Sequence, residues 1–182
     1  MRAFANVEEI IECLTVGGTM LSSESDAFTE LDHGLQTAAL VVGMTPTDVE
    51  LHVAALVHDI AHPWDGPGQP QHAVMGADAV RGVLGARVAD LVAGHVPAKR
   101  WLVTSDTDYP ALLSEDSIIT LAAQGGDMNE SELRWFESLP HWEAMVQLRR
   151  ADDAAKVPGA VVPDLATYLN AIHSVANAQG KQ

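Results

Sequence analysis

The sequence predicts an all-α fold, a single compact helical bundle over residues 1–182. Strand signals are weak, because aromatic residues make up only 5% of the chain and alternating runs of Val, Ile and Thr are rare. Helix signals recur along the whole chain and are separated by short connections. The length of 182 residues suits one domain with a sizeable buried core.

The first three helices are predicted at about 6–16, 29–42 and 45–61. Asn6 is a suitable N-cap for the first helix. Apolar residues recur with helical spacing through the second segment, which Gly43 should end. A Thr-Pro-Thr-Asp sequence at 45–48 is typical of a helix start, and Pro63 should stop the helix that follows it.

A loop is predicted directly after Pro63, because Trp64 and Asp65 are followed by a Gly-Pro-Gly sequence at 66–68. Beyond the loop, helical periodicity returns and continues to the C-terminal region. The predicted helices of this part lie at about 71–84, 87–95, 115–124, 130–138, 141–153 and 163–177.

Composition restricts the partners of the protein. A formal net charge of −15 argues against nucleic acid, since phosphate backbones require clustered Lys and Arg. No uninterrupted apolar run is long enough for a membrane span, and the N-terminal sequence does not resemble a signal peptide. Cys13 is the only cysteine, which excludes an intrachain disulfide and fits a cytoplasmic location. We therefore expect no membrane and no nucleic acid partner; the oligomeric state is left open.

A His-Asp pair, His58-Asp59, lies in an otherwise apolar segment that ends with His62. Burying an imidazole beside a carboxylate is costly unless both have partners. His33 precedes the pair within a predicted helix, and Asp152 follows far downstream. Together with two further histidines at 72 and 95, they offer four neutral imidazoles and two carboxylates. Such a set suits two first-row transition ions better than Mg²⁺, which prefers oxygen ligands.

A spaced His, a His-Asp pair and a distant Asp resemble the HD superfamily of metal-dependent proteins, with a metal-binding core at about 30–155. Longer strings narrow the resemblance, among them LDHGLQ at 31–36, GHVPAKRWLV at 94–103, LSEDS at 113–117 and QGGDM at 124–128. They resemble the mixed-valent diiron oxygenases of the HD type, in particular the 2-amino-1-hydroxyethylphosphonate dioxygenases. The likeness covers about 30–165, which is most of the chain.

The resemblance implies a cofactor of two iron ions, Fe(II)/Fe(III), with O₂ as co-substrate and a small anionic organophosphonate as substrate. It implies oxidative cleavage of the C–P bond of a 1-hydroxyalkylphosphonate, giving a carboxylate and phosphate. Lys99, Ser117 and Arg149 match contacts to the phosphonate oxygens, and a Lys or Arg with hydroxyl donors suits that group. His62 matches a substrate-contacting histidine, so His62 and Lys99 are the candidate catalytic residues. The implied iron ligands, with Asp59 as the bridge, are His33, His58, Asp59, His72, His95 and Asp152.

Two positions depart from the family pattern. A Tyr and a Glu of the aminohydroxyethylphosphonate enzymes correspond here to Ser23 and Asp26. A Ser cannot replace a phenol as an iron ligand or plug, whereas Asp26 can still hold an ammonium group of the substrate. Trp64 offers an aromatic face to a quaternary ammonium, and the alternative is that it packs at the end of a helix. The substituent on the substrate, an amine, a trimethylammonium or none, stays open.

Two other functions use the same residues. The first is an HD-type metal-dependent phosphohydrolase, in which metal-bound hydroxide attacks a phosphoryl group. The second is a ligand sensor without catalytic activity. The complete set of six ligands argues against the sensor, while the identity of the metal and dependence on O₂ separate the oxygenase from the hydrolase.

Overall fold

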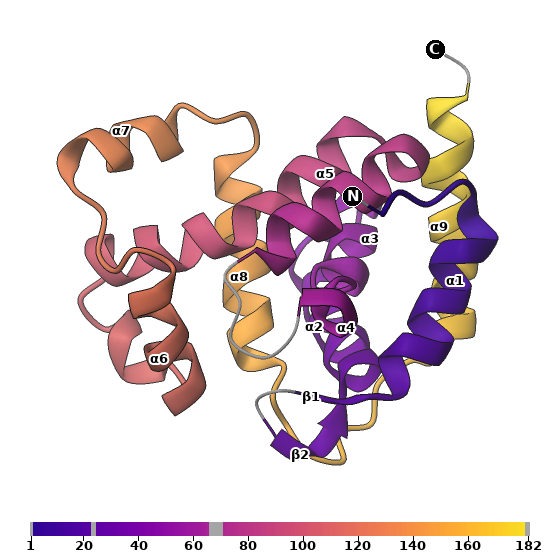
Figure 1. The fold of residues 1–182 in the computed structure, drawn as a ribbon, viewed down its shortest axis with the longest axis horizontal. Helices are drawn as coiled ribbons and strands as arrows, with labels where there is room; N and C mark the ends of the chain where they lie inside the picture. The colour runs from indigo at the N-terminus through magenta and orange to yellow at the C-terminus, as the bar shows by residue number, and fades with distance from the viewer. Residues whose placement is uncertain (1, 23–24, 66–70, 181–182) are drawn as a thin grey trace.

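The computed structural model describes residues 2–22, 25–65 and 71–180, and the regular secondary structure of these residues is almost entirely helical (Figure 1). The all-α prediction is therefore confirmed. The elements, in chain order, are α1 (Val7–Val16), a 3₁₀ turn (Gly17–Thr19), β1 (Leu21–Ser22), β2 (Ser25–Thr29), α2 (Glu30–Met44), α3 (Val49–Val57), α4 (His62–Asp65), α5 (His72–Ser105), a 3₁₀ turn (Tyr109–Leu112), α6 (Glu115–Ala123), α7 (Glu130–Glu137), α8 (Trp142–Ala154) and α9 (Leu165–Gln179).

The N-termini of the first two helices are set by side-chain caps. Asn6 accepts a hydrogen bond from the backbone N–H of Glu9 at the start of α1. Thr29 and Asp32 form a reciprocal capping box at the start of α2, each side chain accepting from the other's backbone N–H. The helices predicted at 6–16 and 29–42 therefore begin where local chemistry satisfies otherwise unpaired donors.

The third helix is shorter than predicted at both ends. Its cap is Asp48, whereas Thr45 ends α2 by donating its backbone N–H to Val41. It also ends at Val57 rather than at residue 61. The next residues form tight turns, in which the N–H of Ile60 bonds the carbonyl of Val57 and that of His62 bonds Asp59. The His-Asp pair therefore lies in turns that follow α3, and not within the helix that was predicted to continue to residue 61.

The helices predicted at 71–84 and 87–95 are two parts of α5. Gly85 joins them with φ of 88°, a left-handed value that glycine adopts at least cost. The second part continues through Pro97 to Ser105, well beyond the predicted end. The short antiparallel pair β1–β2 was not predicted, because its few residues lack a clear alternating pattern.

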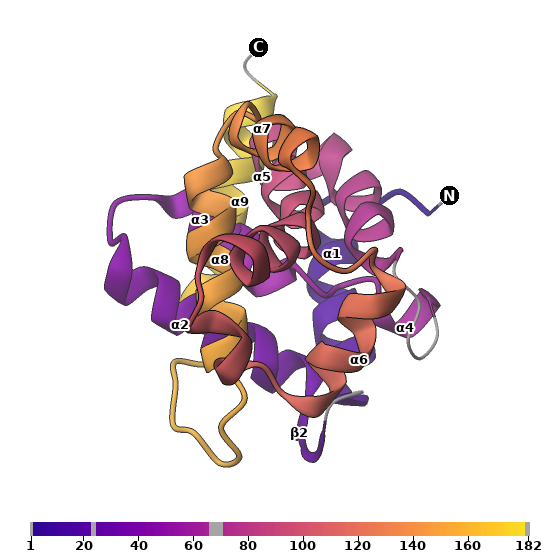
Figure 2. The same ribbon diagram turned by 90° about the vertical axis from the view of Figure 1, so that its left-hand side faces the viewer.

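The helices form two regions, which Figures 1 and 2 show from perpendicular directions. The first, here called the body, contains α1, α2, α3, α8, α9 and the N-terminal part of α5 around a buried core in which Leu51, Val53 and Ala54 have no exposed surface. The second contains α6 and α7, which lie at one end of the molecule beside the C-terminal part of α5. In the described part of the chain, no helix is both long enough and apolar enough to cross a bilayer.

Candidate metal centre

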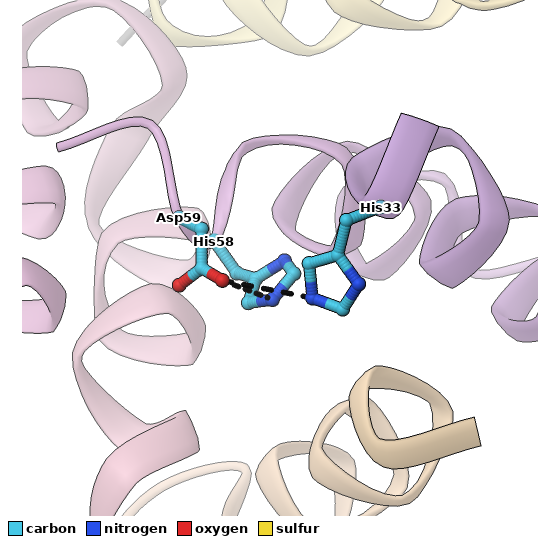
Figure 3. A group of neighbouring side chains, drawn as sticks. All are labelled: His33, His58 and Asp59. Carbon is cyan, nitrogen blue, oxygen red and sulfur yellow. Dashed lines mark ion pairs between the residues drawn. The ribbon is translucent and has the colours of Figure 1, made fainter. Parts of the chain in front are cut away.

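The carboxylate of Asp59 lies at the centre of a group of histidines. Figure 3 shows this carboxylate beside the rings of His58 and His33. The turn that follows α3 directs it inward, because the helix ends just before the pair. His58 caps α3, while His33 projects from the packed neighbour α2, so two helices supply the first part of the cluster.

One oxygen of Asp59 faces two of these rings. Its Oδ2 lies 3.1 Å from Nε2 of His58 and 3.6 Å from Nε2 of His33. Asp152 of α8 completes this side, with Oδ1 3.2 Å from Nε2 of His33 and Oδ2 3.9 Å from Nε2 of His58. Two imidazoles and two carboxylates therefore converge on one position that a metal ion can take.

The other oxygen of Asp59 faces a second set of rings. Its Oδ1 lies 3.5 Å from Nε2 of His72, 3.6 Å from Nε2 of His95 and 3.6 Å from Nε2 of His62. The Nε2 atoms of His72 and His95 are 3.0 Å apart. One carboxylate thus separates two groups of nitrogen ligands, as a bridging ligand between two cations requires.

Backbone carbonyls orient three of the rings. The Nδ1 atoms of His33, His58 and His95 lie 3.1, 2.9 and 2.7 Å from the carbonyl oxygens of Ala155, Ala55 and Val92. A carbonyl only accepts, so each Nδ1 carries the proton in the neutral ring and the Nε2 lone pair faces Asp59. Such outer contacts fix the tautomer that binds a metal.

A second property of the cluster also fits metal ions: some of its buried polar atoms have no hydrogen-bond partner in the described part of the chain, and a bound cation would satisfy them. His58 Nε2 and Asp59 Oδ1 are buried and have no hydrogen-bond partner among the described residues. Burial lowers the pKa of His58, but Asp59, Asp152 and the carbonyl of Ala55 together outweigh burial and raise the pKa to about 9. The ionised carboxylates therefore favour a proton on the imidazole of His58, at a place where bound metal ions would supply the positive charge instead.

The position of His62 is compatible with two roles, a metal ligand and a residue that contacts the substrate. With Asp59 and His72 it offers ligand atoms within 4.8 Å of one another. Its Nδ1 lies 3.2 Å from Oε2 of Glu30, a carboxylate that the sequence had not singled out. Burial lowers the pKa of His62, but Asp59 and then Glu30 raise it to about 9. Its predicted contact with the substrate stays a prediction.

Lys99 and Ser117, predicted to bind the phosphonate, lie together beside the metal cluster. Both are buried, at 2% and 1% exposure. Lys99 Nζ lies 2.9 Å from Oγ1 of Thr120 and 3.4 Å from the carbonyl oxygen of Ser117. Burial, and next the charge of Arg149, lower the pKa of Lys99 to about 7. Its ammonium can therefore exchange a proton near neutral pH.

Arg149 links this group to the metal ligands. Its Nη1 lies 2.8 Å from Oδ2 of Asp152, so the two share one face of α8 as their spacing predicted. Its Nη2 lies 3.5 Å from Oγ of Ser117. Asp153 accepts from Nε and Nη2 of the same guanidinium. We call Lys99, Ser117, Thr120, Arg149 and Lys156 the cation pocket.

Two members of this pocket were missed by sequence reasoning. Lys156 Nζ lies 3.2 Å from Oγ of Ser117, and Thr120 bonds Lys99. A signal was present for Thr120, which lies three residues after Ser117, a spacing that brings helical side chains to one face. Lys156 lies beyond the end of α8, so helical spacing gave no signal for it.

Three further residues were predicted from the sequence: Ser23, Asp26 and Trp64. Ser23 is outside the described residues, and Asp26 lies in β2. Trp64 lies in α4 with its ring centroid 5.7 Å from that of Phe4 and 4.5 Å from the guanidinium carbon of Arg2. Among the described residues, the cation beside the ring of Trp64 is therefore Arg2. This arrangement is compatible with the alternative in which Trp64 packs at the end of a helix.

Comparison with known proteins identifies the class of this fold and site. Residues 31–124 match the HD domain. The chain is 35% identical to hydroxymethylphosphonate dioxygenase of Gimesia maris, over 92% of this chain and 87% of that protein. It is 32% identical to the glycine-betaine-forming [1-hydroxy-2-(trimethylamino)ethyl]phosphonate dioxygenase of Leisingera caerulea, over 75% and 73% of the two chains. The chain belongs to the HD-domain family, in the branch that contains these phosphonate dioxygenases.

Proposed function

We propose that the protein is an O₂-dependent oxygenase that cleaves the C–P bond of a small 1-hydroxyalkylphosphonate at a site with two iron ions in the Fe(II)/Fe(III) state. The observation that carries this proposal is the carboxylate of Asp59, with one oxygen toward each group of histidines and the cation pocket alongside. The relatives named as phosphonate dioxygenases support the same reaction. They favour it over the hydrolysis of a phosphate ester.

The reaction balances without a further reductant. One 1-hydroxyalkylphosphonate and one O₂ give one carboxylate, one hydrogen phosphate and one proton, and the C–P bond is the bond that breaks. Bound iron would supply the redox chemistry with O₂. We assign the six ligands as the sequence predicted them: His33, His58 and Asp152 on one side of Asp59, and His72 and His95 on the other.

The protein's own residues bind and orient the substrate. We assign the phosphonate oxygens to Lys99, Ser117 and Arg149, since charged donors and a hydroxyl suit a dianion. Their burial excludes water and strengthens each electrostatic contact. His62 Nε2 is assigned the contact with the non-phosphonate part of the substrate, with Glu30 holding Nδ1 and so fixing the orientation of the ring.

The two relatives differ, by their names, in the group attached to the hydroxyl-bearing carbon, so the test requires a panel. O₂ uptake and phosphate release are measured together on iron-loaded, partly reduced protein with hydroxymethylphosphonate and with 1-hydroxy-2-aminoethyl and 1-hydroxy-2-(trimethylamino)ethyl phosphonates. We expect equal amounts of O₂ consumed and phosphate released with at least one of them. Electron paramagnetic resonance of the half-reduced protein should show a coupled Fe(II)/Fe(III) pair.

Other outcomes would replace the proposal. Phosphate release from a phosphate ester without O₂ uptake would identify a hydrolase that uses the same ligands. Tight binding of a phosphonate without turnover, in protein shown to contain two irons, would identify a sensor. An Asp90→Ala variant serves as a matched control, because Asp90 is a half-exposed carboxylate paired with Arg81 on α5, away from the cluster.

A further inference from the structure

The hydroxyl of Tyr109 lies between a carboxylate and a guanidinium. Tyr109 begins the 3₁₀ turn Tyr109–Leu112, which connects α5 with α6, and its side chain is only 1% exposed. The hydroxyl donates a hydrogen bond to Oδ2 of Asp153 and accepts one of 3.2 Å from Nε of Arg149. Burial raises the pKa of Tyr109, so the phenol keeps its proton and acts as donor and acceptor at once.

Asp153 and Tyr109 together occupy one edge of the Arg149 guanidinium. Its Nε lies 3.0 Å from Oδ2 of Asp153, and its Nη2 bonds the other oxygen of the same carboxylate. A contact at two points between a planar guanidinium and a carboxylate fixes orientation as well as distance. Tyr109 contacts the same Nε and the same Oδ2, so it reinforces this edge from a second element of the fold.

The other end of the guanidinium faces the metal ligands and Ser117. Its Nη1 lies 2.8 Å from Oδ2 of Asp152, and its Nη2 lies 3.5 Å from Oγ of Ser117. A guanidinium carries five N–H donors in one plane. A plane held by Asp153 and Tyr109 therefore directs the second N–H of Nη2 away from Asp153, to the side on which Ser117 lies. The proposed function places the phosphonate on that side.

The Tyr109 ring is itself held in place, so its hydroxyl is a rigid anchor. The backbone N–H of Tyr109 bonds the carbonyl of Asp106, and the guanidinium carbon of Arg150 lies 5.9 Å from the centre of the ring. A mobile Arg side chain loses rotamer entropy when a ligand orders it, whereas a chain already fixed by folding does not. Holding Arg149 before the substrate arrives should therefore increase affinity for an anion.

We infer that Tyr109 and Asp153 are positioning residues, which hold the guanidinium of Arg149 in the orientation that binds the phosphonate oxygens. The inference rests on the proposed function for the identity of the ligand and for the role of Arg149. Tyr109 and Asp153 act through Arg149 and do not contact the substrate. In the alternative, their contacts only attach the turn before α6 to α8, and their loss would lower stability without changing affinity.

The first test is a binding measurement that needs no turnover. Hydroxymethylphosphonate and inorganic phosphate are titrated by calorimetry, without O₂, into iron-loaded wild-type protein, Tyr109→Phe and Tyr168→Phe, and the iron content of each protein is measured. Tyr168 is the matched control, since it is the other tyrosine of the sequence, is also buried and lies on α9. We expect Kd for both ligands to rise about fivefold in Tyr109→Phe and less than about twofold in Tyr168→Phe, because only the first variant loses a contact with Arg149.

Asp153→Asn should have a larger effect, because the amide nitrogen that replaces one oxygen cannot accept from the guanidinium. We expect Kd for both ligands to rise about tenfold. Asp90→Asn is the control for this change, since Asp90 pairs with Arg81 at the surface of α5.

A double-mutant cycle shows whether Tyr109 acts through Arg149. Arg149→Lys keeps the charge but has no planar Nε edge for Tyr109 and Asp153 to hold. Residues that act through one another give non-additive changes. Tyr109→Phe should therefore raise Kd about fivefold in the wild-type background and less than about twofold in the Arg149→Lys background.

Three results would overturn the inference and leave the proposed function standing. The first is an equal Kd in Tyr109→Phe and Tyr168→Phe. The second is the same fold-change from Tyr109→Phe in both backgrounds. The third is loss of iron from Tyr109→Phe, because the phenol would then serve Asp152 and the metal ligands. Absence of any binding to wild-type protein would overturn both the inference and the proposed function.

Discussion

The metal cluster and the cation pocket are held in place in different ways. The cluster lies in the body, where Val57 and His58 have no exposed surface and backbone carbonyls fix three rings. The pocket lies between the body and α6, whose Ile118 and Ile119 are 53% and 69% exposed. Its contacts with α6 are side-chain hydrogen bonds of Lys99, Arg149 and Lys156. Packing therefore holds the metal ligands in place. The cation pocket is held by polar contacts instead, and a substrate can also take part in such contacts.

The comparison predicts its largest effect at Asp59, which belongs to both groups of ligands. Asp59→Ala should remove the bridge and leave buried imidazoles without their counter-charge. We expect loss of both metal ions and a fall in kcat/KM on the order of 1000-fold, equivalent to about 4 kcal/mol. Metal analysis and steady-state rates check this, with Asp90→Ala as the control. Retention of two metal ions by Asp59→Ala would refute the bridging role.

A smaller effect is expected where α2 meets α3 beneath the cluster. A Cβ added at Gly34 would lie 2.7 Å from the carbonyl oxygen of Leu56, a backbone atom that cannot turn away. Gly34→Ala should therefore lower the free energy of unfolding by about 1–3 kcal/mol, as overpacking does. A Cβ at Gly43 of the same helix meets nothing within 4 Å, and Gly43→Ala should raise stability by about 0.5–1 kcal/mol.

Denaturant unfolding distinguishes these two variants. Equal stability changes at Gly34 and Gly43 would mean that the close approach of α2 and α3 does not set the position of His33 beside His58. The metal content of Gly34→Ala provides a second measure, since a shift of α2 moves His33 away from the ligand group.

In the cation pocket, a substitution should reduce affinity and spare the metals. Ser117→Ala removes a hydroxyl near Arg149 and Lys156. Loss of one hydrogen bond between this hydroxyl and a charged group should cost about 1.5 kcal/mol of binding free energy. We expect KM for the phosphonate to rise about tenfold with the metal content unchanged. Ser138→Ala is the control, because the hydroxyl of this exposed serine bonds the carbonyl of Trp135. Loss of metal from Ser117→Ala would show that the two regions are not separate.

Around neutral pH the smallest effect is a pH dependence from Lys99, whose pKa is lowered to about 7. Only the ammonium form attracts an anion, so phosphonate affinity should fall as pH rises through about 7, at most about tenfold per pH unit. Arg stays charged, so Lys99→Arg should lack this step. Kd is measured for both proteins from pH 6 to 9 with the same phosphonate. The ionisation of the ligand affects both Kd curves equally, so the difference between the curves reports on Lys99. Parallel curves would assign the step to another group.

Much of the fold followed from local sequence signals. Caps at Asn6 and Thr29 and helical periodicity placed most helices within a few residues, because these signals act over single turns. Errors lie at 45–48 and 58–61, where Asp48 caps α3 and tight turns follow Val57, at the end of α5, and at the unpredicted pair β1–β2. At 58–61 the apolar pattern continues, so the local sequence does not distinguish these turns from a helix.

The sequence by itself determined the fold class, the family and the residue types that a metal site requires. Periodicity and caps are carried by neighbouring residues, and the His and Asp residues can be recognised in the sequence without long-range contacts. Only the tertiary structure decided that Asp59 directs one oxygen to each ligand group and that Lys156 joins Lys99 at Ser117. These arrangements depend on the packing of α2, α3, α5, α6 and α8, which brings together side chains that are far apart in the sequence.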